Sequence, residues 1–229
     1  MFRFKQFAVA DDRSSMKVGT DAVLLGAWAQ LPPTGHILEV GCGSGVVALM
    51  LAQRAPQAQI LGIDIDEPSV EQATDNAANS PFRNVAFSVA DFLAYESPFR
   101  VDAVVSNPPY HTETLLSPKE SRAKSRSSFF LPYDSFVYRA DSFLADGGTL
   151  QVVLPAWSET AFHEECNRRG LTLTRITRVK TTDAKPPRRV LMEFRKGEAA
   201  SIERSEITLL NNDGTRSKTY AKLCKDYYL

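Results

Sequence analysis

The fold of the chain is decided by Ile37-Leu38-Glu39-Val40-Gly41-Cys42-Gly43-Ser44-Gly45, an apolar run that enters a glycine-rich loop. A helical pattern over Val46–Arg54 follows the loop, and Pro56 ends it. Glycine allows positive φ and lets the backbone approach a ligand closely. In a doubly wound sheet, ligands bind at the carboxyl ends of strands near the switch point. We therefore predict a strand, a ligand-binding loop and a helix in this order.

Strand and helix patterns alternate along the chain that follows. Strands are predicted at residues 58–63, 85–89, 101–105 and 149–154, and helices at residues 67–79, 133–144 and 157–169. This alternation predicts a doubly wound, mostly parallel α/β sheet. Residues 171–179 and 190–194 have the pattern of an antiparallel pair, which would form a hairpin on the last edge of the sheet.

The segments on either side of this core have weaker patterns. Segment 1–35 contains a predicted helix after Gly19, with Thr20 or Asp21 as a candidate N-cap, and we expect it to lie over the mouth of the sheet. Segment 197–229 has a candidate strand at 207–210 and an apolar end, and we expect it to pack on the core. Because no stretch has the composition of a linker, we expect residues 1–229 to form a single domain with its core at 36–196.

Composition excludes several classes of protein. The chain has 229 residues, of which 43% are hydrophobic, and this is enough for one sizeable core. Its three cysteines are odd in number and far apart, which argues against a disulfide framework and for a reducing compartment. The start has no apolar signal region, and no uncharged run approaches the roughly 20 residues of a membrane span. We therefore expect a cytoplasmic protein without a membrane partner.

Charge is balanced overall but divided along the chain. The formal net charge is zero. Residues 39–91 hold seven acidic and two basic side chains, whereas residues 175–196 hold eight basic and two acidic ones. Such a division indicates a side that faces a polyanion. Solvated loops that happen to be basic would give the same pattern.

Acidic residues follow the second and third predicted strands. Asp64 ends the second strand, and Asp91 and Phe92 follow the third. A carboxylate at a strand end can accept hydrogen bonds from the two hydroxyls of a ribose, although a single such acid could equally be a cap or a loop residue. The dinucleotide pattern G-x-G-x-x-G would need glycine where the chain has Val46. A pyrophosphate is also disfavoured by nearby acids, whereas a cationic ligand tolerates them.

An unusual stretch, Ser106-Asn107-Pro108-Pro109-Tyr110, follows the predicted strand at 101–105. The amino group of a heteroaromatic ring is a poor nucleophile because its lone pair is delocalised. The side-chain oxygen of Asn107 and the carbonyl of Pro108 can accept hydrogen bonds from the two N–H groups of such an amino group. This would direct its lone pair toward a methyl donor. The prolines stiffen the segment, and Tyr110 offers a face on which a ring can stack, worth about 1–3 kcal/mol. We predict Asn107, Pro108 and Tyr110 as the catalytic residues, with no dedicated general base.

Two motifs resemble those of class I S-adenosylmethionine-dependent methyltransferases. The run from Glu39 to Gly45 resembles motif I, and the run from Asn107 to Tyr110 resembles motif IV of the amino methyltransferases. The resemblance implies a Rossmann-like α/β fold whose seven-stranded sheet has an antiparallel last strand. It implies S-adenosylmethionine as the cofactor, with Asp91 accepting from the adenine amino group. The implied cofactor-binding residues are Thr20, Asp21, Glu39, Gly41, Gly43, Gly45, Asp64, Asp91, Phe92 and Asn107, and for Thr20 and Asp21 a simple role at the start of a helix is the alternative.

A wider similarity covers nearly the whole chain. The segments 16–28, 154–155, 185–189 and 226–229 look like those of bacterial tRNA adenine-N6 methyltransferases. That family modifies adenine 37, beside the anticodon of the valine tRNA called tRNA1(Val). One departure is Arg122-Ala-Lys-Ser-Arg126-Ser127, where Ser127 replaces the histidine expected after the tyrosine loop.

Basic residues lie in two predicted loops that could contact the phosphates of an anticodon arm. These candidate substrate-binding residues are Lys119, Arg122, Lys124, Arg126, Lys185, Arg188 and Arg189. We expect a monomer that binds tRNA, and no metal site, because the histidines are scattered. Two alternatives stay open: the same amino methylation of an rRNA base, a DNA base or a protein glutamine amide, and a catalytically silent module that binds S-adenosylmethionine.

Overall fold

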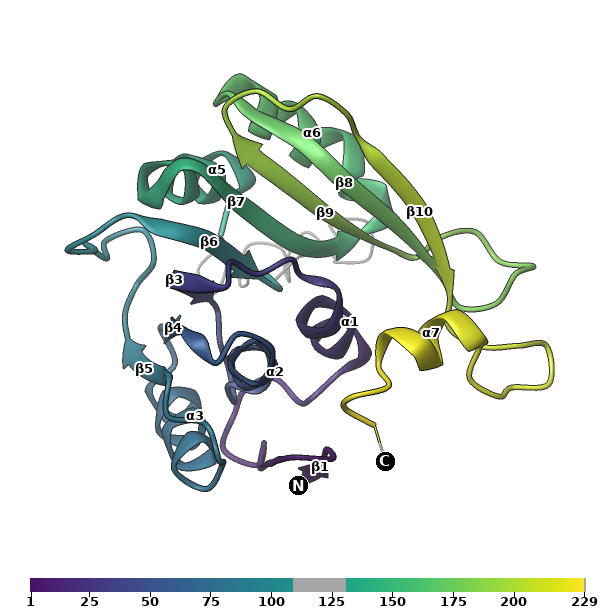
Figure 1. Cartoon of the computed structure of the whole chain (residues 1–229), viewed down its shortest axis with the longest axis horizontal. Coiled ribbons are helices and arrows are strands. Elements are labelled where there is room, and N and C mark those ends of the chain that lie inside the picture. The colour runs from purple at the N-terminus through teal and green to yellow at the C-terminus, as the bar shows by residue number, and fades with distance from the viewer. Residues whose placement is uncertain (109–130, 229) are drawn as a thin grey trace, which may run out of the picture.

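A single twisted sheet runs through the middle of the molecule (Figure 1). The computed structural model describes residues 1–108 and 131–228. Within them the sheet has eight strands in the order β10-β8-β9-β7-β6-β3-β4-β5. The strands are β3 (Thr34–Val40), β4 (Gln57–Asp64), β5 (Val85–Val89), β6 (Val101–Ser106), β7 (Leu144–Pro155), β8 (Leu171–Lys180), β9 (Arg189–Lys196) and β10 (Glu203–Thr208).

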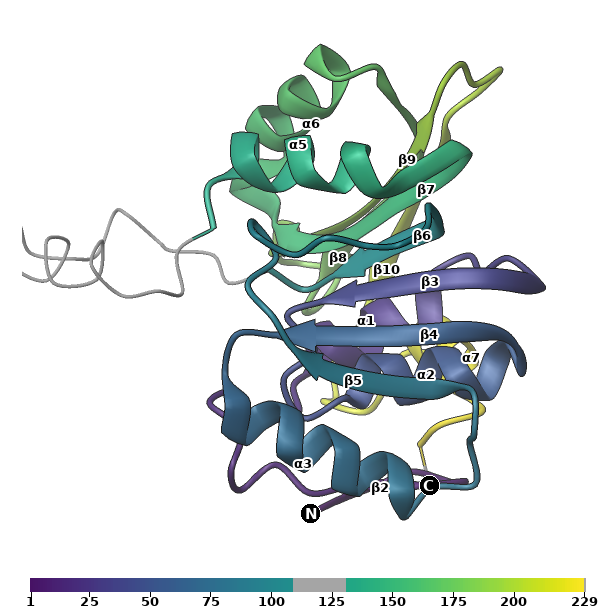
Figure 2. The ribbon, with the colours of Figure 1, turned by 90° about the vertical axis from the view of Figure 1, so that its left-hand side faces the viewer.

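Helices cover both faces of the sheet (Figures 1 and 2). They are α1 (Thr20–Trp28), α2 (Val46–Arg54), α3 (Glu67–Ala78), α5 (Tyr133–Phe143), α6 (Glu159–Arg168) and α7 (Lys218–Leu223), with a 3-10 turn η2 (Ala156–Ser158). A small antiparallel pair, β1 (Phe2–Arg3) and β2 (Ala8–Val9), stands apart from the sheet.

The direction of the strands places their carboxyl ends at one edge of the sheet. β3 pairs in parallel with both β4 and β6, so the strand order reverses on either side of β3. Figure 2 shows the arrowheads of β3, β4 and β5 pointing the same way. β9 is antiparallel to both β7 and β8, and β8 therefore runs in the same direction as β7. Ligands of such folds bind at this edge, at the point of reversal.

Alternating side chains divide the core into two clusters. Ile37 of β3 packs with α1 and α2 on one face, whereas Leu38 packs with α5 and α6 on the other. Every residue from Val46 to Ala52 of α2 is buried, because α1 and the C-terminal segment cover the side that would otherwise face water. A Cβ on Gly26 of α1 would lie 2.7 Å from the Met50 sulfur, so glycine permits the close packing of these two helices.

The C-terminal segment packs against α2 and the N-terminus. Tyr227 is 2% exposed, and its hydroxyl donates a hydrogen bond to the Met50 carbonyl at 3.2 Å. The Lys5 N–H donates to the Tyr227 carbonyl at 2.9 Å, which joins the two ends of the chain. Among the described residues, no helix combines the length and apolar character needed to cross a membrane.

The α/β class with an antiparallel strand among mostly parallel ones is confirmed, but the predicted number of seven strands was wrong. The eighth strand is β10, which pairs in parallel with β8, so the β8–β9 hairpin is not the last edge. β10 also begins four residues before the candidate strand at 207–210. It consists mostly of exposed polar residues and is held by backbone pairing, so it lacks an apolar pattern. At the start of α1, Gly19 is the N-cap and Thr20 is the first helical residue.

Candidate active site

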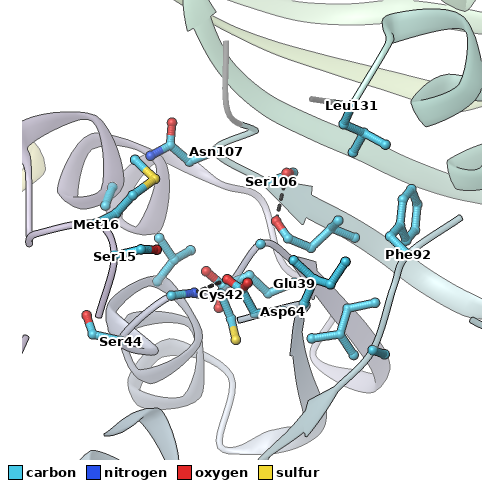
Figure 3. Close-up of a pocket in the computed structure, with 18 of the residues that line it drawn as sticks. Ser15, Met16, Glu39, Cys42, Ser44, Asp64, Phe92, Ser106, Asn107 and Leu131 are labelled. Carbon is cyan, nitrogen blue, oxygen red and sulfur yellow. Dashed lines mark hydrogen bonds between the residues drawn. The ribbon is translucent and has the colours of Figure 1, made fainter. Parts of the chain in front are cut away.

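A cavity of about 380 Å³ opens at the carboxyl ends of β3, β4 and β6 (Figure 3). Its size is within the roughly 300–1,000 Å³ typical of small-molecule sites. Seven residues predicted to bind a cofactor line it, namely Glu39, Gly41, Gly43, Asp64, Asp91, Phe92 and Asn107. The fold thus brings together side chains and backbone from four separate segments of the chain.

The glycine loop has a backbone shape that other residues rarely adopt. Gly41, Gly43 and Gly45 have φ values of 73°, 50° and 81°. A Cβ on Gly41 would meet no atom within 4 Å, so its backbone is open to the cavity. Gly45 does not line the described cavity. A Cβ there would lie 2.7 Å from the ring of Phe87, so this glycine permits the loop and α2 to pack on β5.

Asp64 fixes the glycine loop and faces the cavity. One carboxylate oxygen accepts a hydrogen bond from the Gly43 N–H at 2.8 Å, and the other accepts from the Asp66 N–H at 3.0 Å. Since a carboxylate oxygen can accept more than one hydrogen bond, Asp64 keeps acceptor capacity toward the cavity. Its orientation is set by two backbone donors before any ligand binds.

Glu39 places a second carboxyl at the cavity wall, and it is only 2% exposed. It accepts a hydrogen bond from the Ala48 N–H at 2.8 Å. Burial raises the pKa of Glu39 well above its ordinary value, and the charge of Asp64 raises it further. Because a nearby positive charge favours ionised carboxylates, this pair of acids suits a cationic ligand. Burial also raises the pKa of the Cys42 thiol, which makes it a packing residue and not a nucleophile.

The wall after β5 is largely apolar. The Phe92 ring is buried against Phe136 and Phe143, at centroid distances of 5.4 and 5.6 Å. Asp91 accepts a hydrogen bond from the Leu93 N–H at 2.9 Å. Leu93 and Ile65 line the cavity although they are 40% and 41% exposed. These two apolar side chains suit a flat ring, and no motif of the sequence indicated them. Their only sequence signal is that Ile65 directly follows Asp64 and Leu93 follows Phe92.

Asn107 contributes a buried oxygen that has no hydrogen-bond partner among the described residues. It directly follows Ser106, whose hydroxyl donates to the Val40 carbonyl at 2.8 Å and so ties the ends of β6 and β3 together. Figure 3 shows Asn107 at the rim of the cavity beside Met16. A buried polar group without a partner costs about 1–3 kcal/mol, and native proteins rarely keep one. The oxygen is therefore suited to accept a hydrogen bond from a ligand.

The segment before α1 closes one side of the cavity with Ser15, Met16 and Lys17, three residues that were not predicted individually for the site. Side chains of α3 hold this segment in place. The Gln72 side-chain oxygen accepts hydrogen bonds from the N–H groups of Arg13 and Ser14, at 2.8 and 3.0 Å.

Asn76, one turn further along α3, extends this anchorage. It accepts from the Ala10 N–H at 2.9 Å and donates to the Ala10 and Ser44 carbonyls, at 2.8 and 2.9 Å. Ser44 belongs to the glycine loop. Asn76 therefore joins the segment before α1 to the loop through one buried side chain.

Other predicted site residues lie elsewhere. Thr20 is exposed, and neither it nor Asp21 is among the described residues that line the cavity. Asp21 pairs with Arg189 at 2.7 Å and so joins the start of α1 to the start of β9. Lys185 and Arg188 are exposed in the β8–β9 loop, at the same edge of the sheet as the cavity. Tyr110, Lys119, Arg122, Lys124, Arg126 and Ser127 lie outside the described residues.

The chain is similar in sequence to known proteins. A model of the methyltransferase small domain family matches residues 14–162. The tRNA1(Val) (adenine(37)-N6)-methyltransferase of Bacteroides thetaiotaomicron is 37% identical, over 100% of this chain and 97% of the relative. The protein of the same name from Proteus mirabilis is also 37% identical, over 100% of this chain and 93% of the relative.

Solved structures show similarity at the level of the fold. A predicted O-methyltransferase from Agrobacterium tumefaciens superposes with a TM-score of 0.70 at 18% identity, over 90% of this chain and 96% of that one. Magnesium protoporphyrin IX methyltransferase from Synechocystis, solved with bound S-adenosylmethionine, superposes with a TM-score of 0.51 at 17% identity, over 70% of this chain and 69% of that one.

Proposed function

Because the chain belongs to the methyltransferase small domain family and to the tRNA1(Val) (adenine(37)-N6)-methyltransferases, we infer that it transfers a methyl group from S-adenosylmethionine to N6 of adenine 37 in tRNA1(Val). The observation that carries the mechanism is the buried Asn107 oxygen without a partner, at the end of β6 and at the rim of the cavity. It is an acceptor in the place where an amino group has to be held.

The residues of the cavity fit S-adenosylmethionine. This cofactor supplies a methyl group on a positively charged sulfur, which is already activated toward a nucleophile. Two carboxyls, Glu39 and Asp64, suit its positive charges and its ribose hydroxyls. The apolar side chains of Ile65, Phe92 and Leu93 suit its adenine ring, with Asp91 beside them. We propose these residues, with the backbone of Gly41 and Gly43, as the cofactor site.

Asn107 and Pro108 prepare the acceptor. In this proposal the Asn107 side-chain oxygen and the Pro108 carbonyl accept hydrogen bonds from the two N–H groups of the adenine amino group. This draws the nitrogen toward a tetrahedral shape and directs its lone pair into the cavity. The hydrogen bond from Ser106 to Val40 holds the strand end, and the prolines limit its motion, so orientation precedes binding. The nitrogen loses a proton to water after transfer, and no side chain is needed as a general base.

The tRNA would contact the edge of the sheet that carries the cavity. We propose that Lys185 and Arg188 contact phosphates of the anticodon arm, together with Lys119, Arg122, Lys124 and Arg126, and that Tyr110 stacks on the adenine. The Arg189 guanidinium, which pairs with Asp21, would position the loop. We propose that the chain acts as a monomer, because one chain supplies every described residue of the cavity. A cytoplasmic location fits a tRNA substrate and three free cysteines.

The mechanism is tested with Asn107→Ala. Removing one positioned hydrogen-bonding group at a transition state costs roughly 100- to 1,000-fold in turnover, so we expect methylation of unmodified tRNA1(Val) to fall by at least this range. Binding of S-adenosylmethionine, measured by calorimetry, should be retained. The control is Asn79→Ala, which removes an exposed amide that bonds within α3.

Two results would contradict this reading. Unchanged turnover by Asn107→Ala would remove the proposed role of the amide. Equal methylation of a tRNA1(Val) transcript that has guanosine in place of adenine 37 would instead reject the substrate assignment.

A further inference from the structure

One tryptophan, Trp157, has its side chain exposed to solvent and is not part of the core. Its exposed fraction is 61%, which is larger than that of the other exposed aromatic residues among the described ones. Trp157 lies in η2, the turn that follows β7, at the edge of the sheet that carries the cavity. Exposed aromatic side chains of this size are typical of binding surfaces, where the indole supplies a large rigid contact area.

The turn that carries the indole is held rigidly. The Ala156 N–H donates to the Arg188 carbonyl at 3.1 Å. Ser158 is fully buried, and its hydroxyl donates to the Pro155 carbonyl at 2.8 Å. Both neighbours of Trp157 are thus fixed, one to the β8–β9 loop and one to the end of β7. The indole stands on a fixed turn in a defined place.

The position of this turn relative to Asn107 follows from the strand register. Ser106 of β6 pairs with Val152 of β7, and the two strands are parallel. Asn107 lies one residue beyond this pair and Trp157 five residues beyond it. At about 3.3 Å per residue the two are separated by at most ~13 Å along the strand direction. That distance corresponds to roughly four stacked nucleotides at ~3.4 Å each.

A loop with two exposed basic residues contacts the turn that carries the indole. The Arg188 carbonyl accepts the hydrogen bond from the Ala156 N–H of this turn. The side chains of Arg188 and Lys185 are exposed in the β8–β9 loop. An aromatic face beside cations is the usual composition of surfaces that bind unpaired nucleotides, because the cations track the phosphates while the ring stacks on a base. A purely apolar protein contact would not need these charges.

We propose that Trp157 is a binding residue for the tRNA: it stacks on an unpaired base of the anticodon loop close to the methylated adenine. The proposal rests on the function inferred above and names one further contact of that substrate. In this arrangement the adenine enters the cavity at Asn107 while a neighbouring base of the same loop rests on the indole.

The first experiment measures tRNA affinity. A base that stacks on an aromatic ring contributes enough that Trp157→Ala should weaken binding of a tRNA1(Val) transcript by about 5- to 150-fold. Trp157→Phe keeps a stacking face and should restore most of the affinity. The control is Phe99→Ala, an aromatic residue 46% exposed before β6, at the opposite edge of the sheet.

Affinity for S-adenosylmethionine and turnover at saturating tRNA should be unchanged in Trp157→Ala. The dependence of tRNA affinity on salt should also keep its slope, because stacking releases no counterions. A flatter slope would assign Trp157 to a structural role for the basic loop and overturn the proposal.

The second experiment reads the indole itself. The chain has two tryptophans, and the other, Trp28, is only 6% exposed. Iodide should therefore quench mainly Trp157, and bound tRNA1(Val) should quench its emission and protect it from iodide. Trp157→Phe should show neither effect. Full accessibility to iodide with saturating tRNA would overturn the proposal, as would unchanged tRNA affinity in Trp157→Ala.

The outcomes separate this proposal from the function on which it rests. A wild-type protein that fails to methylate tRNA1(Val) rejects the function. Normal methylation together with an unaltered tRNA affinity in Trp157→Ala rejects the stacking contact alone. If Trp157→Ala instead changed only the sedimentation of the protein, the indole would belong to a contact between copies of the chain, and the proposal would be wrong.

Discussion

At the scale of single residues, the site keeps polar groups that folding alone would disfavour. The Asn107 oxygen is buried without a partner among the described residues, and Glu39 is a carboxyl with 2% exposure. Each lowers the stability of the protein in the absence of ligand, since buried polar groups need partners and buried charges need compensation. Both become favourable when a ligand supplies an N–H donor or a positive charge. The local cost therefore belongs to the chemistry of the site.

We expect Glu39→Gln to change the pH dependence of the melting temperature and, separately, the affinity for S-adenosylmethionine. Because burial raises the pKa of Glu39, its ionisation does not penalise the fold below its unfolded pKa, and the fold loses stability as pH rises from there through the folded pKa. The glutamine amide does not titrate, and its oxygen can still accept from Ala48. The difference in melting temperature between Glu39→Gln and the wild type should therefore increase between about pH 5 and pH 8. The increase should be roughly 2–4 °C for each kcal/mol of unfolding free energy that the wild type loses.

The same variant should bind S-adenosylmethionine more weakly, because glutamine cannot ionise beside the bound cation as the Glu39 carboxyl can. Glu71→Gln serves as the control, since its side chain is 63% exposed on α3. If the melting temperatures of Glu39→Gln and the wild type changed equally with pH across this range, the pKa of Glu39 would not be raised by folding.

At the scale of elements, α3 does more than cover the sheet. Its Ser69, Gln72 and Asn76 are buried polar residues at successive turns of one face. This face bonds the backbone of the segment before α1, which in turn lines the cavity. An ordinary amphipathic helix would present apolar residues there. The polar stripe gives an irregular segment the hydrogen-bond partners that its buried backbone requires.

Gln72→Ala tests this role of α3. The substitution removes the acceptor of two backbone N–H groups, which costs about 1–3 kcal/mol when such groups stay buried. We expect faster hydrogen exchange in residues 12–17 and an affinity for S-adenosylmethionine that is weaker by about 5- to 10-fold, because the cavity wall must first be ordered. Thr74→Ala is the control, since Thr74 is exposed and bonds only within the helix. Unchanged exchange in this segment would contradict the role.

At the scale of the whole molecule, one edge of the sheet collects the residues that we propose for cofactor binding, catalysis and tRNA binding. The glycine loop, Asp64 and Asn107 stand at the ends of parallel strands. The loop with Lys185 and Arg188 reaches the same edge because β8 runs in the same direction as β7. A long polyanion can therefore contact the basic loop while one of its bases reaches the cavity. No separate RNA-binding domain is needed for such a contact.

Salt dependence tests this arrangement. The affinity for tRNA1(Val) should fall steeply as salt rises, with a logarithmic slope of about 0.7–0.9 for each phosphate contact. Arg188→Ala should reduce this slope by roughly one contact. Arg83→Ala removes an exposed cation just before β5, at the opposite edge, and should leave it unchanged. Flat binding from low to high salt would reject phosphate contacts by this edge.

Much of the core and several of the residues that line the cavity could be predicted from local patterns. The strand that ends in the glycine loop, the carboxylate after the second strand and the amide after the fourth are each set by a short stretch, because strand, turn and helix preferences act over a few residues. Asp64 and Asn107 meet at one cavity because parallel strands place their carboxyl ends at the same edge. Composition and alternation also sufficed for the class of the fold.

The amino-acid sequence by itself determined the order of strands and helices, the motifs and, through its resemblance to relatives, the reaction. Only the tertiary structure decided which side chains are exposed or paired: Asp21 meets Arg189, Met16 reaches the cavity wall, and Trp157 stands in solvent beside a basic loop. It also decided the eighth strand, which pairs through backbone groups that every residue carries. Exposure and pairing depend on contacts between segments far apart in the chain, and no local pattern records them.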